Sequence, residues 1–238
     1  MSDAANSIHP SAQLIGDVRL GSGNTIGPLA VIIGPVEIGD GNWFGTGAVV
    51  GAPPEVRGFE HPRDAASFSA GNGVTIGSRN TIREYAQIHQ GWHDRTVVGD
   101  DAFIMNQSYI AHDCRLGDGV TLASSVLLAG HVELGDGANL GLGVSVHQRR
   151  YVGAGAMVGM GAVVTRDLPP WAKAFGNPAR VRGANAVGMR RAGLPDDAVD
   201  ELVRLYAEGG SAELRPEHPD LALRFAEWAE RTDAVGRA

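Results

Sequence analysis

Apolar residues recur at every sixth position through most of this 238-residue chain. The steps run from Ile8 to Val50 without a miss, resume at Ile76, and run again from Val98 to Val164. The periods of a helix and of a simple strand do not give this spacing. It predicts one short strand and one turn per six residues, with the apolar side chain pointing inward. Stacked repeats bury an apolar core that no single repeat could bury alone, so we expect an all-β solenoid.

The spacing is interrupted twice, and both interruptions are typical of loops inserted between repeats. The first covers 51–73, where prolines and glycines are frequent, and the second lies near 90–97. If the second insertion has four residues, Ile88 lies one coil before Ile110. Glycine often follows the apolar position directly, as Gly117 does, and it suits a turn because it reaches positive φ at little steric cost.

The repeat ends at a Pro-Pro pair, and the composition beyond it becomes typical of helices. We therefore divide the chain into a β-helix over 1–183 and a small α-helical domain over 184–238. Helical spacing and capping residues predict helices that open at Asn185, Pro195 and Pro219. Their apolar faces predict packing rather than a ligand site: Val199, Leu202, Val203 and Tyr206 in the second helix, and Leu221, Phe225 and Trp228 in the third.

Composition and charge narrow the functional classes. A net charge of -7 argues against general nucleic-acid binding. The single cysteine, Cys114, excludes an internal disulfide framework. No apolar run approaches the ~20 residues of a membrane span, and residues 1–10 lack the pattern of a signal peptide. We therefore expect a cytoplasmic protein.

Four of the eight histidines fall at equivalent places in the repeat. If three repeats form one coil of 18 residues, every third repeat lies directly above the one before, about 4.8 Å away. The turns after these repeats then share one edge of the solenoid and hold His89, His112, His131 and His147.

This histidine edge admits three interpretations. Polar turn residues can simply cover a solvated corner. Imidazoles are also common metal ligands, and the γ-class carbonic anhydrases carry histidines on a similar β-helix, but their closely spaced H-x-x-x-x-H is missing here. A histidine with a pKa near neutrality can also act as a general base, and Asp113 beside His112 would then fix the tautomer.

Seven runs of sequence are more specific than the repeat itself: IHPSA (8–12), IGPLAVIIGPVEIGDG (26–41), IREYAQIHQG (82–91), YIAHDC (109–114), LAGHVELGD (128–136), VHQ (146–148) and DLPPWAKAFGNPARVRGAN (167–185). They resemble the acyl-ACP:UDP-N-acetylglucosamine O-acyltransferases of lipid A biosynthesis, members of the hexapeptide-repeat acyltransferase superfamily. The similarity covers nearly the whole chain, including the helical tail.

The resemblance implies a triangular, left-handed parallel β-helix and a homotrimer whose sites lie between subunits. It also implies transfer of a (3-hydroxy)acyl chain from acyl carrier protein to the 3-position of a UDP-N-acetylglucosamine-type sugar nucleotide, the first step of lipid A type biosynthesis. No metal or other cofactor is implied, because the acyl donor is carried on the phosphopantetheine of the carrier protein.

The resemblance also assigns roles to individual residues. His112 becomes the base that deprotonates the sugar hydroxyl, Asp113 orients it, and the Gly130 N–H stabilises the oxyanion. Substrate-binding positions are His89, Tyr109, His131, His147, Gln148 and Met160, with Asn185 and Arg191 at the nucleotide end. Candidates for contacting the acidic carrier protein, with solvated surface charge as the alternative, are Arg149, Arg150, Arg180, Arg182 and Arg190.

The chain departs from the family pattern in four features. Tyr109 stands where the family usually carries a histidine, and the acid-x-base pair that contacts the sugar is only loosely matched by Glu55 and Arg57. The stretch between Val50 and Ile76 is also about one coil shorter. Met160 stands at the acyl-chain ruler, which predicts a donor of medium length; the alternative is that this side chain merely fills core space.

Three other functions remain open on the sequence. The departures from the pattern motivate a related acyltransferase that uses another nucleotide sugar or an acyl-CoA, outside lipid A synthesis. A γ-carbonic-anhydrase-like metalloenzyme and a non-catalytic trimeric scaffold are the two candidates from other classes.

Overall fold

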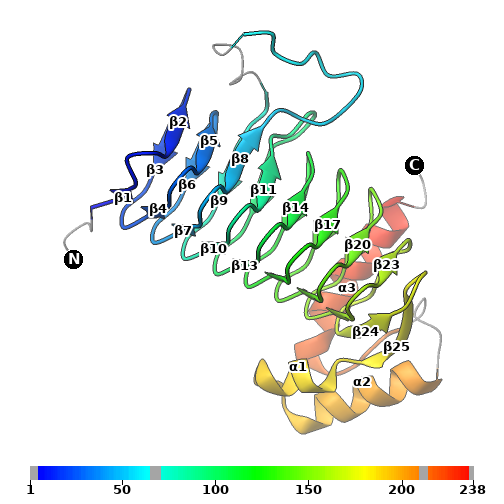
Figure 1. The fold of residues 1–238 in the computed structure, drawn as a ribbon. Coiled ribbons are helices and arrows are strands. Elements are labelled where there is room, and N and C mark those ends of the chain that lie inside the picture. Colours follow the sequence, from blue (N-terminus) through cyan, green and yellow to red (C-terminus); the bar gives the residue numbers. More distant parts are fainter. Residues whose placement is uncertain (1–4, 65–70, 209–213, 236–238) are drawn as a thin grey trace.

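The protein is a three-sided parallel β-helix with helices at its C-terminal end (Figure 1). The computed structural model describes residues 5–64, 71–208 and 214–235, the last five without their side chains. Three parallel sheets form the sides, and the chain visits them in turn as it winds. The β-solenoid that the six-residue repeat predicts is therefore confirmed.

Each sheet is a stack of very short strands, one from every coil. Sheet A contains β1 (Ser7–Ile8), β4 (Thr25–Ile26), β7 (Trp43–Phe44), β10 (Thr81–Ile82), β13 (Phe103–Ile104), β16 (Thr121–Leu122), β19 (Asn139–Leu140), β22 (Met157–Val158), β24 (Ala172–Phe175) and β25 (Arg180–Ala184). Sheet B contains β2 (Gln13–Ile15), β5 (Val31–Ile33), β8 (Val49–Ala52), β11 (Gln87–His89), β14 (Tyr109–Ile110), β17 (Leu127–Leu128), β20 (Ser145–Val146) and β23 (Val163–Val164). Sheet C contains β3 (Val18–Leu20), β6 (Val36–Ile38), β9 (Val74–Ile76), β12 (Thr96–Val98), β15 (Arg115–Leu116), β18 (Glu133–Leu134) and β21 (Tyr151–Val152).

Strand register confirms the 18-residue coil and measures both insertions. Ile110 pairs with Leu128, which pairs with Val146, at 18-residue steps. Val50 pairs with Ile88, 38 residues on, so the first insertion adds 20 residues to a coil. Ile88 pairs with Ile110, 22 residues on, so the second insertion adds four.

The six-residue apolar positions fill the inside of the prism. From Ile26 to Val164 these side chains are buried, and small or branched residues such as Ala30 and Val120 fill the second inward position. Ile8 and Leu14, in the first coil, stay about two-fifths exposed at 42% and 41%. Within the described residues their coil pairs on one side only, so the end of the core is open to water.

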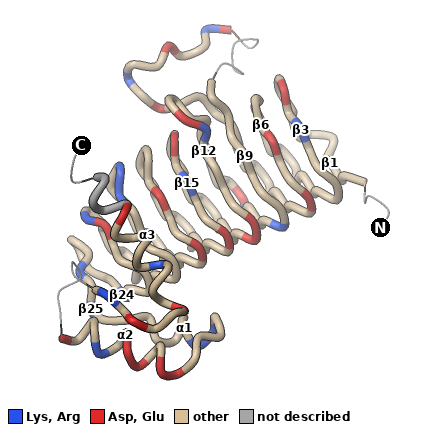
Figure 2. Tube along the Cα trace, turned by 180° about the vertical axis from the view of Figure 1, so that it is seen from behind, with Lys and Arg blue, Asp and Glu red and all other residues tan. Residues whose placement is uncertain are grey.

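The edge that joins sheet C to sheet A is tied together by two ladders of side chains. Inside it, Asn24, Asn42 and Asn80 stack, and each Oδ1 accepts the backbone N–H of the equivalent residue one coil later. Outside it, aspartates such as Asp118 accept a backbone N–H from the coil before, and Figure 2 shows red segments repeated along this edge. These bonds satisfy polar groups that the tight turns would otherwise leave unpaired.

An antiparallel hairpin, β24 and β25, ends sheet A and leads into the helices. These are α1 (Ala186–Arg191), α2 (Asp196–Glu208) and α3 (Pro219–Val235), which open where the sequence predicts. The predicted inward faces are confirmed except at Val203, which is 42% exposed because it lies beside, not on, the buried stripe of α2. None of the helices in the described residues has the length and apolar character needed to cross a bilayer.

Candidate active site

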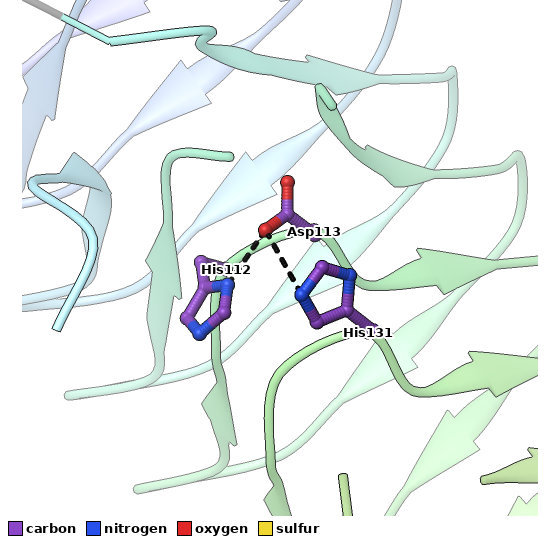
Figure 3. Close-up of side chains that lie close together, drawn as sticks. All are labelled: His112, Asp113 and His131. Atoms are coloured by element: carbon purple, nitrogen blue, oxygen red, sulfur yellow. Dashed lines mark hydrogen bonds and ion pairs between the residues drawn. The ribbon is translucent and has the colours of Figure 1, made fainter. Parts of the chain in front are cut away.

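Three residues from two successive turns converge at the edge between sheets B and C (Figure 3). His112 and Asp113 follow β14, and His131 follows β17 one coil later. The Nδ1 of His112 lies 2.6 Å from Oδ2 of Asp113, and the Nε2 of His131 lies 3.6 Å from the same oxygen. The Asp113 side chain is 1% exposed, whereas those of His112 and His131 are 14% and 22% exposed. A buried carboxylate thus supports two histidines that water and ligands can reach.

The second oxygen of Asp113 is held by the backbone of the second insertion. Oδ1 accepts the N–H groups of Trp92 at 3.0 Å, His93 at 2.9 Å and Asp94 at 2.7 Å. The Asp113 N–H in turn donates to Oγ1 of the buried Thr96 at 3.0 Å. Three successive N–H groups around one oxygen form an anion-binding nest.

These contacts decide the protonation states at the edge. Burial alone would raise the pKa of Asp113, but the hydrogen bonds from His112 and from the backbone of Asp94 and His93 outweigh it and lower that pKa. Burial lowers the pKa of His131, and the positive charge of Arg149 adds to this, against the attraction of Asp113. The carboxylate therefore stays charged while His131 favours its neutral form.

Gly130 lies against the ring of His112. A Cβ at this position would stand 2.5 Å from both Cε1 and Nε2 of that ring, so a larger residue would displace the ring or the turn. Within the described part of the chain, the Gly130 N–H donates to no acceptor, although its neighbours Ala129 and His131 both donate to the adjoining coils. A free, fixed N–H beside an imidazole is what an oxyanion hole requires.

The next coil adds His147 and Gln148 to the same edge, both exposed. The Nδ1 of His147 lies 3.2 Å from the carbonyl oxygen of Gln148. Their register after β20 places them one coil beyond His131, as predicted from the spacing.

His89, one coil before His112 and Asp113, forms a second group with Tyr109 of their own coil and with Glu55 of the first insertion. The Nδ1 of His89 lies 2.9 Å from both the Glu55 carboxylate and the carbonyl oxygen of Pro53. The His89 and Tyr109 rings lie 5.1 Å apart. The Nε2 of His89 is buried and has no hydrogen-bond partner among the described residues.

Charge pairing governs this second group. Burial would lower the pKa of His89 and raise that of Glu55, but their mutual hydrogen bond and attraction reverse both shifts, so the pair is ionised. Burial and the Glu55 carboxylate raise the pKa of Tyr109, which stays a neutral phenol.

A shallow apolar pocket runs along sheet B beside the histidine edge. Almost all of the surface that lines it is carbon, and the polar atoms are few. Such a surface suits an aliphatic chain better than a sugar. It is lined by Tyr109, Leu127, Leu128, Ala129, Ser145 and Val146.

Other predicted residues lie on different edges of the same chain. Met160 lies in the turn between β22 and β23, at the edge joining sheets A and B, and is 74% exposed. The alternative that it fills core space is therefore wrong, because the inward positions of its coil belong to smaller residues. Asn185 caps α1 through the Gly188 N–H and donates to the Gly155 carbonyl oxygen, near the edge joining sheets C and A.

Two of the five candidate arginines form ion pairs within the described residues. Arg150 lies 3.3 Å from Asp167, and Arg190 lies 3.1 Å from Asp196. Four of the five candidates are exposed, namely Arg149, Arg180, Arg182 and Arg190. Arg191, the candidate at the nucleotide end, is exposed as well.

Sequence reasoning missed Trp92 and His93, which the second insertion places over the site. The Trp92 ring meets His112 edge-on at 6.2 Å, and His93 stacks at 6.0 Å from His131. The only signal was the position of the insertion, four residues that break the repeat immediately after His89.

Comparisons with known proteins agree with this geometry. The family model described as bacterial transferase hexapeptide (six repeats) matches residues 95–130, and the model for domain 2 of UDP N-acetylglucosamine O-acyltransferase matches residues 167–209. The β-helix and the first of these matches thus place the chain with the hexapeptide-repeat proteins of the bacterial transferase type. A UDP-N-acetylglucosamine acyltransferase from Campylobacter jejuni, solved as a structure, is 33% identical with a TM-score of 0.71, and 94% of each chain is covered. This chain belongs to the UDP-N-acetylglucosamine acyltransferase family.

Curated relatives share the same description over a shorter stretch. An acyl-[acyl-carrier-protein]–UDP-N-acetylglucosamine O-acyltransferase of Thermodesulfovibrio yellowstonii is 45% identical over 151 residues, which is 61% of this chain and 57% of that protein. One of Burkholderia vietnamiensis is 38% identical over 148 residues, 61% of this chain and 56% of that protein. The chain thus matches somewhat more than half the length of these relatives.

Proposed function

We propose that this protein transfers an acyl chain from acyl carrier protein to the 3-position of a UDP-N-acetylglucosamine-type sugar nucleotide, the first step of lipid A type biosynthesis. The observation that carries the proposal is the His112–Asp113 pair beside the free N–H of Gly130, next to a shallow apolar pocket that begins at Ala129 and Tyr109. The names of the curated relatives supply the donor and the acceptor class.

The chemistry follows from the positions of three groups. With Nδ1 turned to Asp113, His112 offers Nε2 to remove the proton from the sugar hydroxyl. The hydroxyl oxygen attacks the thioester carbonyl carbon, and the Gly130 N–H stabilises the negative charge on the carbonyl oxygen. The carbon–sulfur bond then breaks, and the proton on His112 passes to the phosphopantetheine sulfur.

Asp113 supports this cycle without changing its own charge. Its lowered pKa keeps it ionised, so it stabilises the imidazolium that forms at His112. His131, His147 and Gln148 continue the edge and would line the acceptor and acyl pocket. No step requires a metal or another cofactor.

The substrate-binding residues are proposed to assemble from more than one copy of the chain. Within one protomer, Met160, the histidine edge, and Asn185 with Arg191 belong to three different edges of the prism. A homotrimer would bring the edge of one prism against the face of another, and Met160 would then limit the acyl chain to medium length. Exposed arginines, Arg149 and Arg180 among them, would meet the acidic carrier protein.

One observation favours a second candidate, a metal-dependent enzyme. His112, Asp113 and His131 offer ligand atoms that all lie within 4.8 Å of one another. Two of the possible ligand atoms already have hydrogen-bond partners, which argues against a metal. Oδ1 of Asp113 accepts backbone N–H groups, and Nδ1 of His112 faces Oδ2 of Asp113. Metal analysis of the purified protein decides: stoichiometric zinc that His112→Ala releases would replace the acyltransferase proposal.

Incubation with a panel of UDP-sugars and acyl donors, read by mass spectrometry, tests the function. The panel contains acyl-ACPs and acyl-CoAs of several lengths, with and without a 3-hydroxyl. We expect one O-acylated UDP-N-acetylglucosamine-type product from a medium-length acyl-ACP. Preference for another nucleotide sugar or for acyl-CoA would assign the related acyltransferase instead, and no product with any pair would favour the scaffold.

A further inference from the structure

The two oxygens of Asp113 have entirely different partners. Oδ1 accepts three backbone N–H groups, from Trp92, His93 and Asp94, and Oδ2 faces His112 and His131. In solution the Cβ–Cγ bond of an aspartate rotates freely and its two oxygens are equivalent. The different partners of the two oxygens must therefore be imposed by the surrounding protein. The three donors all belong to the second insertion.

The loop that supplies these donors is itself rigidly held. Its Gly91 N–H donates to the Gly73 carbonyl oxygen at 3.1 Å, and the Asn72 side chain donates to the Trp92 carbonyl oxygen at 2.8 Å. A Cβ on Gly91 would fall 1.4 Å from the Asp94 carbonyl oxygen, so the loop is too tight for any larger residue there. The end of the first insertion thus braces the second, and the two breaks in the repeat meet at the candidate active site.

We propose that residues 90–95 are the positioning element of the general base: their backbone N–H nest fixes Asp113 and thereby sets the tautomer of His112. Because Oδ1 already accepts three N–H groups, only Oδ2 is left to accept a hydrogen bond from His112. That hydrogen bond requires a proton on Nδ1 of His112. The lone pair is then left on Nε2, the nitrogen beside Gly130. The four extra residues act through the backbone, so no side-chain pattern in the sequence reveals them.

The kinetic consequences of this inference rest on the proposed function. The tautomer of His112 does not depend on that function and can be measured without a substrate. The three N–H donors of the nest require that the side-chain atom of residue 113 that faces the loop be a hydrogen-bond acceptor. A change that keeps the shape and alters only the donor pattern tests this directly.

Asp113→Asn compared with Asp113→Ala is the discriminating pair. In the nest, the asparagine oxygen must face the three N–H groups, so its NH2 faces Nδ1 of His112 and forces the proton onto Nε2, which removes the base. Alanine lets His112 adopt either tautomer. We expect Asp113→Asn to transfer acyl groups about tenfold or more slowly than Asp113→Ala, although asparagine is the closer mimic. If asparagine is the milder change, it has turned its oxygen to His112 and the nest does not set the orientation.

Nitrogen-15 NMR of the histidines gives a readout that needs no substrate. At a pH where the ring is neutral, we expect His112 to carry its proton on Nδ1 in the unaltered protein and on Nε2 in Asp113→Asn. The same tautomer in both proteins would overturn the inference. If instead the unaltered protein acylates nothing, the proposed function fails while the nitrogen shifts still decide the inference.

A second pair removes one donor of the nest without touching Asp113. Asp94→Pro deletes the N–H that makes the shortest contact, at 2.7 Å, and Asp94→Ala is the matched control because it loses the same side chain but keeps the N–H. We expect the proline variant to show a mixture of His112 tautomers and a lower kcat than the alanine variant. Equal tautomers and equal kcat in the two folded proteins would contradict the role of the nest.

Discussion

At the scale of single residues, the site depends on what lies beside each functional group more than on the group itself. His112 is one of four histidines on its edge, yet it alone has a buried carboxylate at 2.6 Å and a glycine against its ring. His147 lies on the same edge and is exposed, with its Nδ1 beside a backbone carbonyl. Burial and partners, which spacing does not report, therefore separate the proposed base from its neighbours.

Gly130→Ala tests the contact between the oxyanion position and the base. The added Cβ would stand 2.5 Å from Nε2 of His112, and the turn would have to shift to admit it. We expect kcat for acyl transfer to fall by about 10²-fold or more, since both the donor and the base move. A variant that folds normally by circular dichroism and keeps full kcat would show that Gly130 is not part of the site.

The ionised pair of His89 and Glu55 predicts a pH dependence of stability. The pKa of His89 is raised, so its contribution is complete below the ordinary value of 6.5 and is lost as pH rises through the raised value. The pKa of Glu55 is lowered, so its contribution is present above the ordinary value of 4.5 and is lost on acidification through the lowered value. The pair thus stabilises most between these two ordinary values.

His89→Gln removes this dependence. We expect the unaltered protein to lose more thermal stability than the variant between about pH 6 and about pH 9, measured by calorimetry. Parallel losses in the two proteins would mean that the pair is not ionised in this range.

At the scale of elements, the repeat builds the scaffold and its interruptions build the site. Counting apolar positions predicted the strands, whereas the 18-residue coil was an expectation from the family resemblance and the four-residue length of the second insertion was a condition for placing Ile88 beside Ile110. Strand register confirms both. The sequence could not predict the nest around Asp113, because backbone N–H groups carry no sequence signal. The sequence could not predict the pairing of Glu55 with His89 either, because the first insertion has no periodicity from which the positions of its side chains follow.

The asparagine ladder is an element whose contribution can be measured. Asn42 is 1% exposed, and its Oδ1 accepts both the backbone N–H and the side-chain NH2 of Asn80. Asn42→Ala leaves the buried donors of Asn80 and the partly buried Gly77 carbonyl oxygen without these partners. We expect the free energy of unfolding to fall by about 2–4 kcal/mol.

Urea denaturation measures that loss, with Asn139→Ala as the control because Asn139 is exposed on the outer side of β19. The control should change stability by less than about 0.5 kcal/mol. Equal effects of the two substitutions would mean that the ladder adds nothing to the stacking of coils.

At the scale of the whole molecule, the prism separates the proposed site into parts that a single chain cannot join. The proposed base His112 lies on the edge between sheets B and C, Met160 on the edge between A and B, and Asn185 near the edge between C and A. We propose that a homotrimer resolves this separation. We expect light scattering to give three times the 24.9 kDa mass of the chain.

Subunit mixing then tests whether sites are shared. His112→Ala and Arg191→Ala are each expected to lose most activity, and co-expression of the two is expected to restore part of it, because mixed trimers contain some sites with both residues intact. A monomer, or mixed trimers as inactive as the single variants, would mean that each chain carries its own complete site.

The most direct test of the central claim is the acyl-transfer rate of His112→Ala. The account predicts a fall in kcat of about 10²- to 10⁴-fold, the usual contribution of a general base, with the melting temperature and trimer mass unchanged. Acyl transfer at the unaltered rate by a folded His112→Ala protein would contradict the account.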